Sequence, residues 1–222
     1  MDFTKFSTLF SPARISRYSA ATQHDCNKTI MLYEENLKIG QAFMPLLSVL
    51  EVVLRNKLYE EISLFSKDKY WIIDPNHVFR KSWYLSKEVT KQENDCKTKL
   101  DKNKFCNHIV SSVTFGFWVE FFTKYTFKLL RGRPIKIFRR LPAGYNSARI
   151  HKRLNEIREF RNRLYHNEPI IFNARIVDFG GCEKIHDDIL EILKLLDTDL
   201  LNFIKPLDNV SSYIALAKQR II

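Results

Sequence analysis

The clearest hydrophobic pattern in the chain lies between residues 43 and 65. Apolar residues recur there at intervals of three and four, which is the spacing of one buried face of an α-helix. The positions concerned are Leu46, Leu47, Leu50, Val53, Leu54, Leu58, Ile62 and Phe65. We therefore predict a core helix over this segment.

A second apolar stripe with the same spacing lies near the end of the sequence. Its members are Ile185, Ile189, Ile192, Leu193, Leu196, Leu200, Phe203 and Ile204. The acidic residues between them are expected largely on the solvent side of the helix. They are Asp187, Asp188, Glu191, Asp197 and Asp199. Residues 211–222 are expected to add one last short helix.

In the rest of the first half of the chain, short sequence motifs predict where helices begin and where a loop interrupts them. Ser11 and Pro12 form an N-cap followed by proline at the first helical position, and residues 13–37 favour helix, which predicts an opening helix or helix pair. Aromatic residues and proline interrupt the period over residues 67–84, which indicates a loop packed onto the core. A mostly polar helix is expected over residues 86–104.

The second half begins with an aromatic-rich segment, residues 109–130. It lacks the period-two alternation of a strand, so we predict helix, broken near Gly116. Turn signals at residues 131–134 and 141–144 bracket a short basic segment. Residues 147–167 then favour a helix that ends before Pro169. The patterns together predict an all-α fold, an irregular helical bundle, in a single domain over residues 1–222.

Composition favours a soluble protein without a cofactor. The longest uncharged apolar stretches, near residues 39–50 and 109–119, are shorter than a membrane span, and no signal-peptide pattern opens the chain. We therefore expect a cytoplasmic protein. Phosphate-binding loops, dinucleotide fingerprints and zinc-protease motifs do not occur in the sequence, so we expect neither nucleotide nor metal.

Four cysteines are widely spaced, and we interpret them as reduced, mostly buried thiols. Cys96, Cys106 and His108 form the one cluster that resembles a metal site. A fourth ligand at zinc spacing is missing from it, so we predict no metal centre.

Positive charge is concentrated in one part of the chain. Residues 121–165 contain thirteen Lys and Arg against two acidic residues, whereas the remainder contains 23 of each kind. A solvated basic face is the ordinary explanation for surface lysines and arginines. Such a strong segregation nevertheless favours a polyanion, because each phosphate contact also releases condensed counterions. We therefore expect a nucleic-acid partner.

Candidate chemistry lies at the end of this basic segment, where Arg161, Asn162 and His166 occur in the last turns of the predicted helix. Asn162 and His166 are four residues apart and share a face, whereas Arg161 is about 140° around the helix from His166. One helix therefore cannot easily pair Arg161 with His166. Two copies of it meeting antiparallel across a two-fold axis could, which predicts a homodimer.

These residue types suit metal-free cleavage of RNA. The reaction removes a proton from a 2′-hydroxyl, supplies one to the 5′-leaving oxygen and stabilises charge on the phosphorane. Histidine can act as acid or base near neutral pH, and arginine offers a permanently charged fork to phosphate oxygens. Asn162 would hold the imidazole or the phosphate. On spacing alone, a salt-bridging arginine and a histidine favoured by the helix dipole explain the pair better.

A family resemblance changes this balance. Arg161-Asn162-x-x-x-His166 resembles the HEPN hallmark, and I-R-E-F-R-N-R-L-Y-H-N-E-P-I-I over residues 157–171 more narrowly resembles the Abi-like abortive-infection proteins. Tyr33-x-x-Asn36 leading to L-L-S-V-L-E-V-V-L-R-N-K-L at residues 46–58, and V-T-F-G-F-W at 113–118, are also similar to that family. The resemblance covers roughly residues 11–203.

The resemblance implies N-terminal helices at 11–66 packed on a HEPN core, a motif helix at about 147–168 and C-terminal helices at 183–222. It also implies a dimeric, metal-independent endoribonuclease acting in phage defence or a toxin–antitoxin system, with an RNA or protein antitoxin as a possible partner. Two positions depart from related patterns: Asn167 stands where many Abi-like proteins carry a second histidine. Glu168 replaces the tyrosine of HEPN toxins that pair with nucleotidyltransferases.

Three functional hypotheses follow. In the first, Arg161, Asn162 and His166 cleave RNA that the neighbouring basic residues bind. Those basic residues are Arg139, Arg140, Lys152, Arg153, Arg158 and Arg163. In the second, the chain is a HEPN module that binds RNA without cutting it. In the third, it senses a phage component and uses its basic surface for an acidic protein. We favour the first, because a pure binding module does not need His166.

Overall fold

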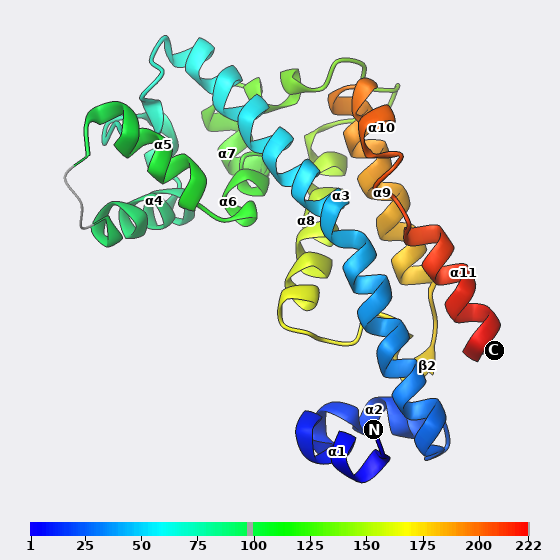
Figure 1. Cartoon of the computed structure of the whole chain (residues 1–222). Helices are drawn as coiled ribbons and strands as arrows, with labels where there is room; N and C mark the ends of the chain where they lie inside the picture. Colours follow the sequence, from blue (N-terminus) through cyan, green and yellow to red (C-terminus); the bar gives the residue numbers. More distant parts are fainter. Residues whose placement is uncertain (97–99, 222) are drawn as a thin grey trace. The chain divides into compact units, whose positions relative to one another are not determined.

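The computed structural model describes residues 1–96 and 100–221, and helices dominate it (Figure 1). Among these residues the strands are confined to one antiparallel hairpin of β1 (Phe172–Asn173) and β2 (Ile176–Val177). The prediction of an all-α fold is confirmed.

The chain divides into two compact units, each assembled from segments that are distant in sequence. The first unit comprises Met1–Ser48, Phe160–Glu191 and Leu200–Ile222, and the second comprises Val49–Glu159 and Ile192–Asp199. Four helices contribute residues to both units. They are α3 (Cys26–Ser66), α8 (Ser147–Tyr165), α9 (Gly180–Leu196) and α10 (Asp199–Ile204). The single domain expected over residues 1–222 stays a prediction.

The predicted helix start at Ser11 and Pro12 is present, but it is preceded by a helix that we did not predict. Helix α1 (Phe3–Phe10) is followed by α2 (Pro12–Ala21), and the Ser11 hydroxyl accepts a hydrogen bond from the Arg14 backbone N–H at 3.4 Å. This is the N-cap arrangement that Ser11 and Pro12 indicated. Gln23 and His24, with φ of 54° and 65°, separate α2 from α3, so the opening segment is a helix pair.

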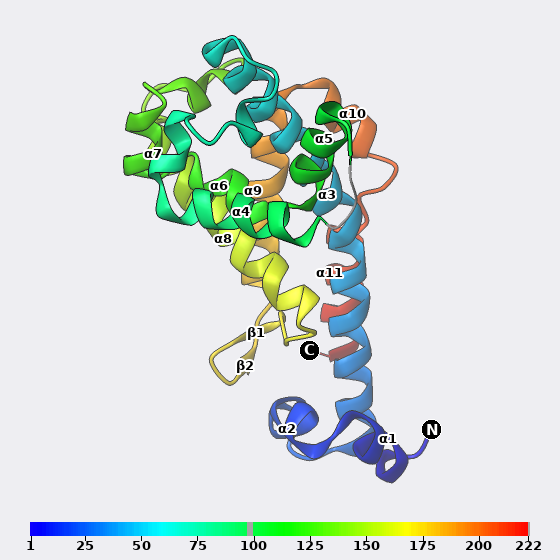
Figure 2. The ribbon, with the colours of Figure 1, turned by 90° about the vertical axis from the view of Figure 1, so that its left-hand side faces the viewer.

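Helix α3 merges two segments that the sequence pattern kept apart. It runs for 41 residues through Pro45, which lacks the N–H needed for one of the helix's internal hydrogen bonds (Figures 1 and 2). The predicted apolar face is largely buried, since six of its eight positions are at most 4% exposed. Val53 and Phe65, at the margins of this face, are half-buried.

By length and composition alone, α3 is apolar enough to cross a membrane, although the uncharged stretch within it is short. Its most apolar 18-residue window has a mean hydropathy of 1.6, and 39% of that window is buried inside the protein. The core helix of a soluble protein has the same character. The structure is therefore compatible with a soluble protein.

Aromatic contacts and ion pairs hold the first unit together. The Tyr33 ring lies 5.4 Å from that of Phe6 and 5.1 Å from that of Tyr18, which in turn contacts Phe172 of β1 at 5.3 Å. Helix α11 (Val210–Ile221) runs beside α3 (Figure 1). Its Arg220 pairs with the buried Glu35 of α3 at 2.8 Å. The predicted C-terminal helix is thus present.

The second unit has an aromatic core. Trp71 is fully buried, and its ring lies 5.2 Å from that of Phe79 and 5.9 Å from that of Phe121. Trp71 and Phe79 belong to two short 3-10 helices, η1 (Trp71–Ile73) and η2 (Val78–Lys81). The predicted loop packed onto the core is confirmed, except that α4 (Trp83–Asp95) begins before residue 84.

The single helix predicted over residues 86–104 is wrong. Helix α4 ends at Asp95 and α5 (Lys102–Ser112) begins after Asp101, whose carboxylate accepts from the Lys104 N–H at 2.9 Å. Residues 97–99 of the predicted helix lie outside the described residues. An aspartate inside the polar pattern therefore started a new helix, because it can cap the free N–H groups of the next turn.

The helical prediction for residues 109–130 is correct, and the break predicted near Gly116 lies two residues before it, at residues 113–114, with a second one at residues 121–123. Short non-helical segments separate α5 from α6 (Phe115–Glu120) and α6 from α7 (Lys124–Leu129). Gly116 is buried inside α6, where an added Cβ would stand 3.0 Å from the Tyr84 hydroxyl. Its role is therefore to permit close packing and not to end a helix.

The remaining elements follow the predicted order. Gly132, at a φ of 75°, precedes the 3-10 helix η3 (Arg133–Ile137), and α10 (Asp199–Ile204) follows α9. The C-terminal apolar stripe is mostly buried, although Phe203 is 61% exposed. Asp188, expected on the solvent side, is buried and pairs with Lys184 at 2.9 Å.

Candidate active site

Helix α8 ends in a Schellman motif that fixes the backbone around His166. The Asn167 N–H donates to the Leu164 carbonyl at 2.9 Å, and the Glu168 N–H donates to the Arg163 carbonyl at 2.8 Å. Asn167 has a φ of 53°, a left-handed conformation that asparagine tolerates better than most residues. The left-handed helix end therefore favours an asparagine at this position.

The three predicted catalytic residues lie together in the last turns of α8, within the first unit. The backbone N–H of His166 donates to the Asn162 carbonyl at 3.0 Å, so helical geometry extends to His166. Asn162 and His166 are exposed, and neither side chain has a hydrogen-bond or ion-pair partner among residues 1–96 and 100–221. Both are therefore available to a ligand.

Arg161 is held by an aromatic ring. Its guanidinium carbon lies 4.4 Å from the centre of the Tyr165 ring, one turn along the helix. The imidazole of His166 makes no hydrogen bond with Arg161 in the single chain, as its spacing along the helix led us to expect. Tyr165 was missed in the sequence, although an Arg-x-x-x-Tyr spacing on a helix is the signal for such a pair.

Two arginines form hydrogen bonds and an ion pair with the loop after α8. The Arg163 guanidinium donates to the Pro169 carbonyl, and its Nε lies 3.8 Å from Glu168 Oε2. Arg14, at the start of α2, donates to the Asn167 carbonyl at 2.6 Å. Arg163 thus supports the site locally, and its expected contact with RNA stays a prediction.

Helix α3 packs against the end of α8 and the loop that follows it. The Oδ1 atom of Asn36, a residue only 5% exposed, accepts from the Ile170 N–H at 2.8 Å. At Gly40 an added Cβ would stand 3.0 Å from Leu164 Cδ2, so the end of α8 packs closely against this part of α3. The Cys182 thiol donates to the Ile170 carbonyl at 3.4 Å, and burial raises its pKa to about 12, which keeps it protonated.

A cavity of about 160 Å³ lies between α3 and the end of α8. Residues of α3 line one side, and residues at and beyond the end of α8 line the other. The lining residues are Asn36, Leu37, Gly40, Gln41, Met44, Leu164, Asn167 and Glu168. Two of them, Asn167 and Glu168, directly follow His166 in the chain. The cavity is therefore lined by the two residues that follow the candidate catalytic residue, while His166 itself is not one of its lining residues.

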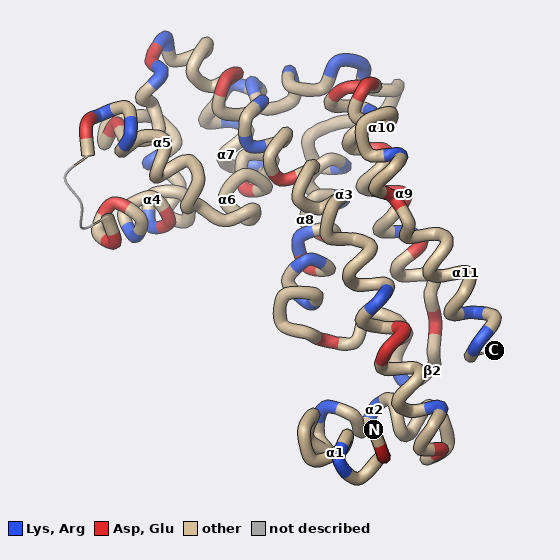
Figure 3. The backbone as a smooth tube through the Cα atoms, in the orientation of Figure 1, with Lys and Arg blue, Asp and Glu red and all other residues tan. Residues whose placement is uncertain are grey.

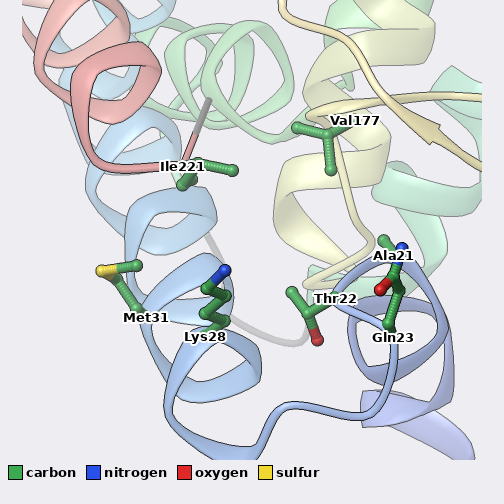
Figure 4. A pocket seen from close by; sticks show the side chains of 7 residues that line it. All are labelled: Ala21, Thr22, Gln23, Lys28, Met31, Val177 and Ile221. Atoms are coloured by element: carbon green, nitrogen blue, oxygen red, sulfur yellow. The ribbon is translucent and has the colours of Figure 1, made fainter.

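A second cavity of the first unit, of about 210 Å³, does not involve the motif (Figure 4). Its walls come from the turn after α2, the start of α3, strand β2 and the end of α11. The lining residues are Ala21, Thr22, Gln23, Lys28, Met31, Val177 and Ile221. None of the predicted site residues lines it, so it has no part in the candidate active site.

Three predicted RNA-binding residues lie on the part of α8 that belongs to the second unit, where basic segments follow one another along the helix (Figure 3). Lys152 is exposed and has no partner among the described residues. Arg153 lies with its guanidinium 5.5 Å from the Tyr145 ring centre. Arg158 is less accessible, because its Nε is buried and its Cδ packs 3.4 Å from the position of an added Cβ at Gly116.

The other two predicted RNA-binding residues, Arg139 and Arg140, follow η3. Arg140 is exposed, whereas Arg139 pairs with Asp197 at 3.1 Å while its side chain remains 67% exposed. Arg149, which the sequence analysis did not single out, lies 4.2 Å from the Tyr145 ring centre. Tyr145 is thus flanked by Arg149 and Arg153, which its spacing of four and eight residues could have indicated.

Other ionisable groups of the second unit have structural roles. Burial lowers the pKa of His151 on α8, with a smaller opposing effect from Glu120. Burial raises the pKa of the Cys106 thiol, which lies 3.1 Å from the Tyr59 hydroxyl. Within residues 1–96 and 100–221, no three His, Cys, Asp or Glu side chains are grouped so that they could hold a metal ion.

Comparison with protein-family models, curated proteins and solved structures yielded no match for this chain.

Proposed function

We propose that this chain is a metal-independent endoribonuclease of the Abi-like family in the HEPN superfamily. The observation that supports it best is the exposed, unpartnered imidazole of His166 at the fixed end of α8. The helix dipole can favour a histidine at this position, but it does not require the side chain to be left accessible. Here the backbone is tightly held while the side chain is left free, as expected of a group that acts on a ligand.

The proposed chemistry is internal transesterification. His166 takes the proton of a 2′-hydroxyl, the 2′-oxygen bonds to phosphorus, and the bond from phosphorus to the 5′-oxygen breaks as that oxygen receives a proton. The products are a 2′,3′-cyclic phosphate and a 5′-hydroxyl. Arg161 would stabilise charge on the phosphorane, and Asn162 would orient the imidazole or the phosphate.

A homodimer fits this chemistry, because one imidazole cannot accept and donate a proton at the same moment. His166 of the partner subunit would supply the acid when two copies of α8 meet across a two-fold axis. Within each chain, Tyr145 with its two arginines and the exposed Lys152 offer a stacking surface and charge for RNA. We propose that the enzyme acts in the cytoplasm as an abortive-infection or toxin-type effector, restrained by an RNA or protein antitoxin.

The test is incubation of purified protein with mixed cellular RNA in EDTA. Wild type is compared with His166→Ala and with His108→Ala, a matched control that removes a histidine of α5 whose side chain has no hydrogen bond among the described residues. Cleavage by wild type and the control, absent in His166→Ala, with 2′,3′-cyclic phosphate ends, supports the proposal. Intact RNA in all three samples rejects it, and salt-sensitive RNA binding in that case would favour the non-catalytic module.

A further inference from the structure

The cavity beside His166 contains an unused hydrogen-bond donor. Asn36 is 95% buried, and its Oδ1 must face the Ile170 N–H because only an acceptor satisfies that group. The side-chain NH₂ of Asn36 therefore points away from Ile170, and it has no partner among residues 1–96 and 100–221. Asn36 Nδ2 is not among the fully buried unpaired atoms of the described residues, so it reaches the solvent of the cavity, where an acceptor on a ligand can take the place of water.

An acceptor lies on the opposite wall of the same cavity. Glu168 is half-exposed, lines the cavity, and has its Oε2 atom 3.8 Å from Arg163 Nε. The side-chain amides of Gln41 and Asn167 add groups that can donate or accept. Leu37, Met44 and Leu164 provide apolar surface between them. The cavity thus combines apolar walls with a donor on one side and a carboxylate on the other.

The dimensions suit one planar ring. A cavity of about 150 Å³ can enclose a benzene ring, and this one, of about 160 Å³, is lined partly by exposed residues. The six-membered ring of a purine can therefore enter while its sugar stays outside. Because Asn167 and Glu168 directly follow His166, the sugar and phosphate of that nucleotide would lie close to the imidazole.

Among the four RNA bases, guanine matches this arrangement. Its N1–H and N2–H₂ are adjacent donors for one carboxylate, and its O6 beside them accepts a hydrogen bond. Adenine and cytosine each present a ring-nitrogen acceptor to the carboxylate, and uracil presents a single N–H between two carbonyls. A carboxylate therefore attracts guanine and disfavours the others.

We propose that this cavity binds a guanine base next to the phosphate that is cleaved, with Glu168 accepting from N1–H and N2–H₂ and Asn36 donating to O6. The inference rests on the proposed ribonuclease function and adds its base specificity. Arg163 and Arg14 become positioning residues for the guanine site, because they hold the loop that carries Glu168.

The test uses oligonucleotides with 2′-O-methyl groups, which cannot be cleaved, so binding is measured independently of catalysis. Four oligonucleotides differ in one base, G, A, C or U, and a fifth carries inosine, which lacks the N2 amino group. We expect wild type to bind the G oligonucleotide about tenfold more tightly than the other standard bases. Inosine should lose several-fold of that affinity.

Glu168→Gln should lose most of the preference and bind guanine and inosine alike. Glu60→Gln is the matched control, since it removes one exposed carboxylate of α3 that does not line the cavity. Circular dichroism checks that both variants are folded. If Glu168→Gln still binds the guanine oligonucleotide more tightly than the inosine oligonucleotide, the assignment is overturned.

Equal wild-type affinity for all bases, or no binding at all, would also overturn the guanine site. The ribonuclease proposal is decided separately, by the His166-dependent cleavage of mixed RNA. An enzyme that cuts with cyclic phosphate ends at all four bases would keep that function and lose the guanine site.

Discussion

The guanidinium carbon of Arg161 lies 4.4 Å from the centre of the Tyr165 ring, one helical turn further along α8. Two residues with flexible side chains thus fix each other at the end of a helix, next to the exposed His166. The ring restricts the directions in which the Arg161 guanidinium group can point toward a phosphate. This contact makes Tyr165 a positioning residue in the proposed reaction.

Replacing Tyr165 should therefore lower cleavage modestly. We expect Tyr165→Leu to reduce kcat/KM about two- to fivefold, the equivalent of one exposed cation–π contact, and Tyr165→Phe to restore it because the ring face is kept. Arg161→Ala should cost about 10²- to 10³-fold, the usual loss of one transition-state donor. Initial rates on a fluorescent RNA measure both. A Tyr165→Phe variant as poor as Tyr165→Leu would show that the hydroxyl, and not the ring, matters.

Asn167 should be replaceable by glycine but not by alanine. At a φ of 53°, alanine pays a steric cost of about 1–2 kcal/mol that glycine avoids. For a chain of this size, we expect Asn167→Ala to lower Tm by roughly 2–8 °C and Asn167→Gly to leave it within about 2 °C. Thermal unfolding followed by circular dichroism measures the difference. Equal Tm values for the two variants would contradict the left-handed helix end.

Stability in acid should depend on Glu35. Burial raises its pKa, but hydrogen bonds from Lys38 and Arg220 outweigh burial, so the pKa lies below the ordinary value. A depressed folded-state pKa contributes stability above the unfolded pKa, near 4.5, and that contribution is lost as pH falls through the folded value. We expect Glu35→Gln to cost about 1–2 kcal/mol at pH 7.

The difference in free energy of unfolding between wild type and Glu35→Gln should shrink steadily below about pH 4.5. Urea unfolding at a series of pH values measures it. Glu34→Gln is the neighbouring control, because Glu34 is exposed and has no ion-pair partner among the described residues. A wild-type to Glu35→Gln difference that is constant with pH would remove Glu35 as the cause.

RNA binding should depend more on Lys152 than on Arg139. Lys152 is exposed and unpartnered, whereas Arg139 already pairs with Asp197 at 3.1 Å. We expect Lys152→Gln to reduce the slope of log affinity against log salt by about 0.7, one phosphate contact on a single strand. Arg139→Gln should change it less. Fluorescence anisotropy over a salt series tests this, and the reverse order would place the RNA along η3 and not along α8.

The fold class could be predicted from the sequence because helical periodicity is a local signal. Leu46 to Ile62 and Ile185 to Leu196 show it without interruption, and both segments are buried helices. Local signals failed where the outcome depended on one capping side chain. Asp101 started a new helix inside a polar pattern. Gly116 lies inside α6 and not at the break beside it, because Tyr84 packs closely against it, which nothing in the sequence reveals.

The candidate site was only partly predictable for the same reason. Arg161, Asn162 and His166 are close in sequence and share one helix, so their proximity could be predicted. The contact between Asn36 and Ile170 joins residues that are 134 positions apart, and tertiary packing alone creates it. The cavity beside His166 could therefore not be foreseen from the order of the residues.

The discontinuous first unit has a consequence for how the protein is made. Residues 1–48 leave the ribosome long before α11, whose Arg220 and Lys218 pair with Glu35 and Glu183. Until then the apolar side of α3 lacks its late partners, and contacts of such high sequence separation form slowly. A nascent chain of this kind leaves part of α3 uncovered until its late segments are made, which is the kind of exposure on which chaperones act.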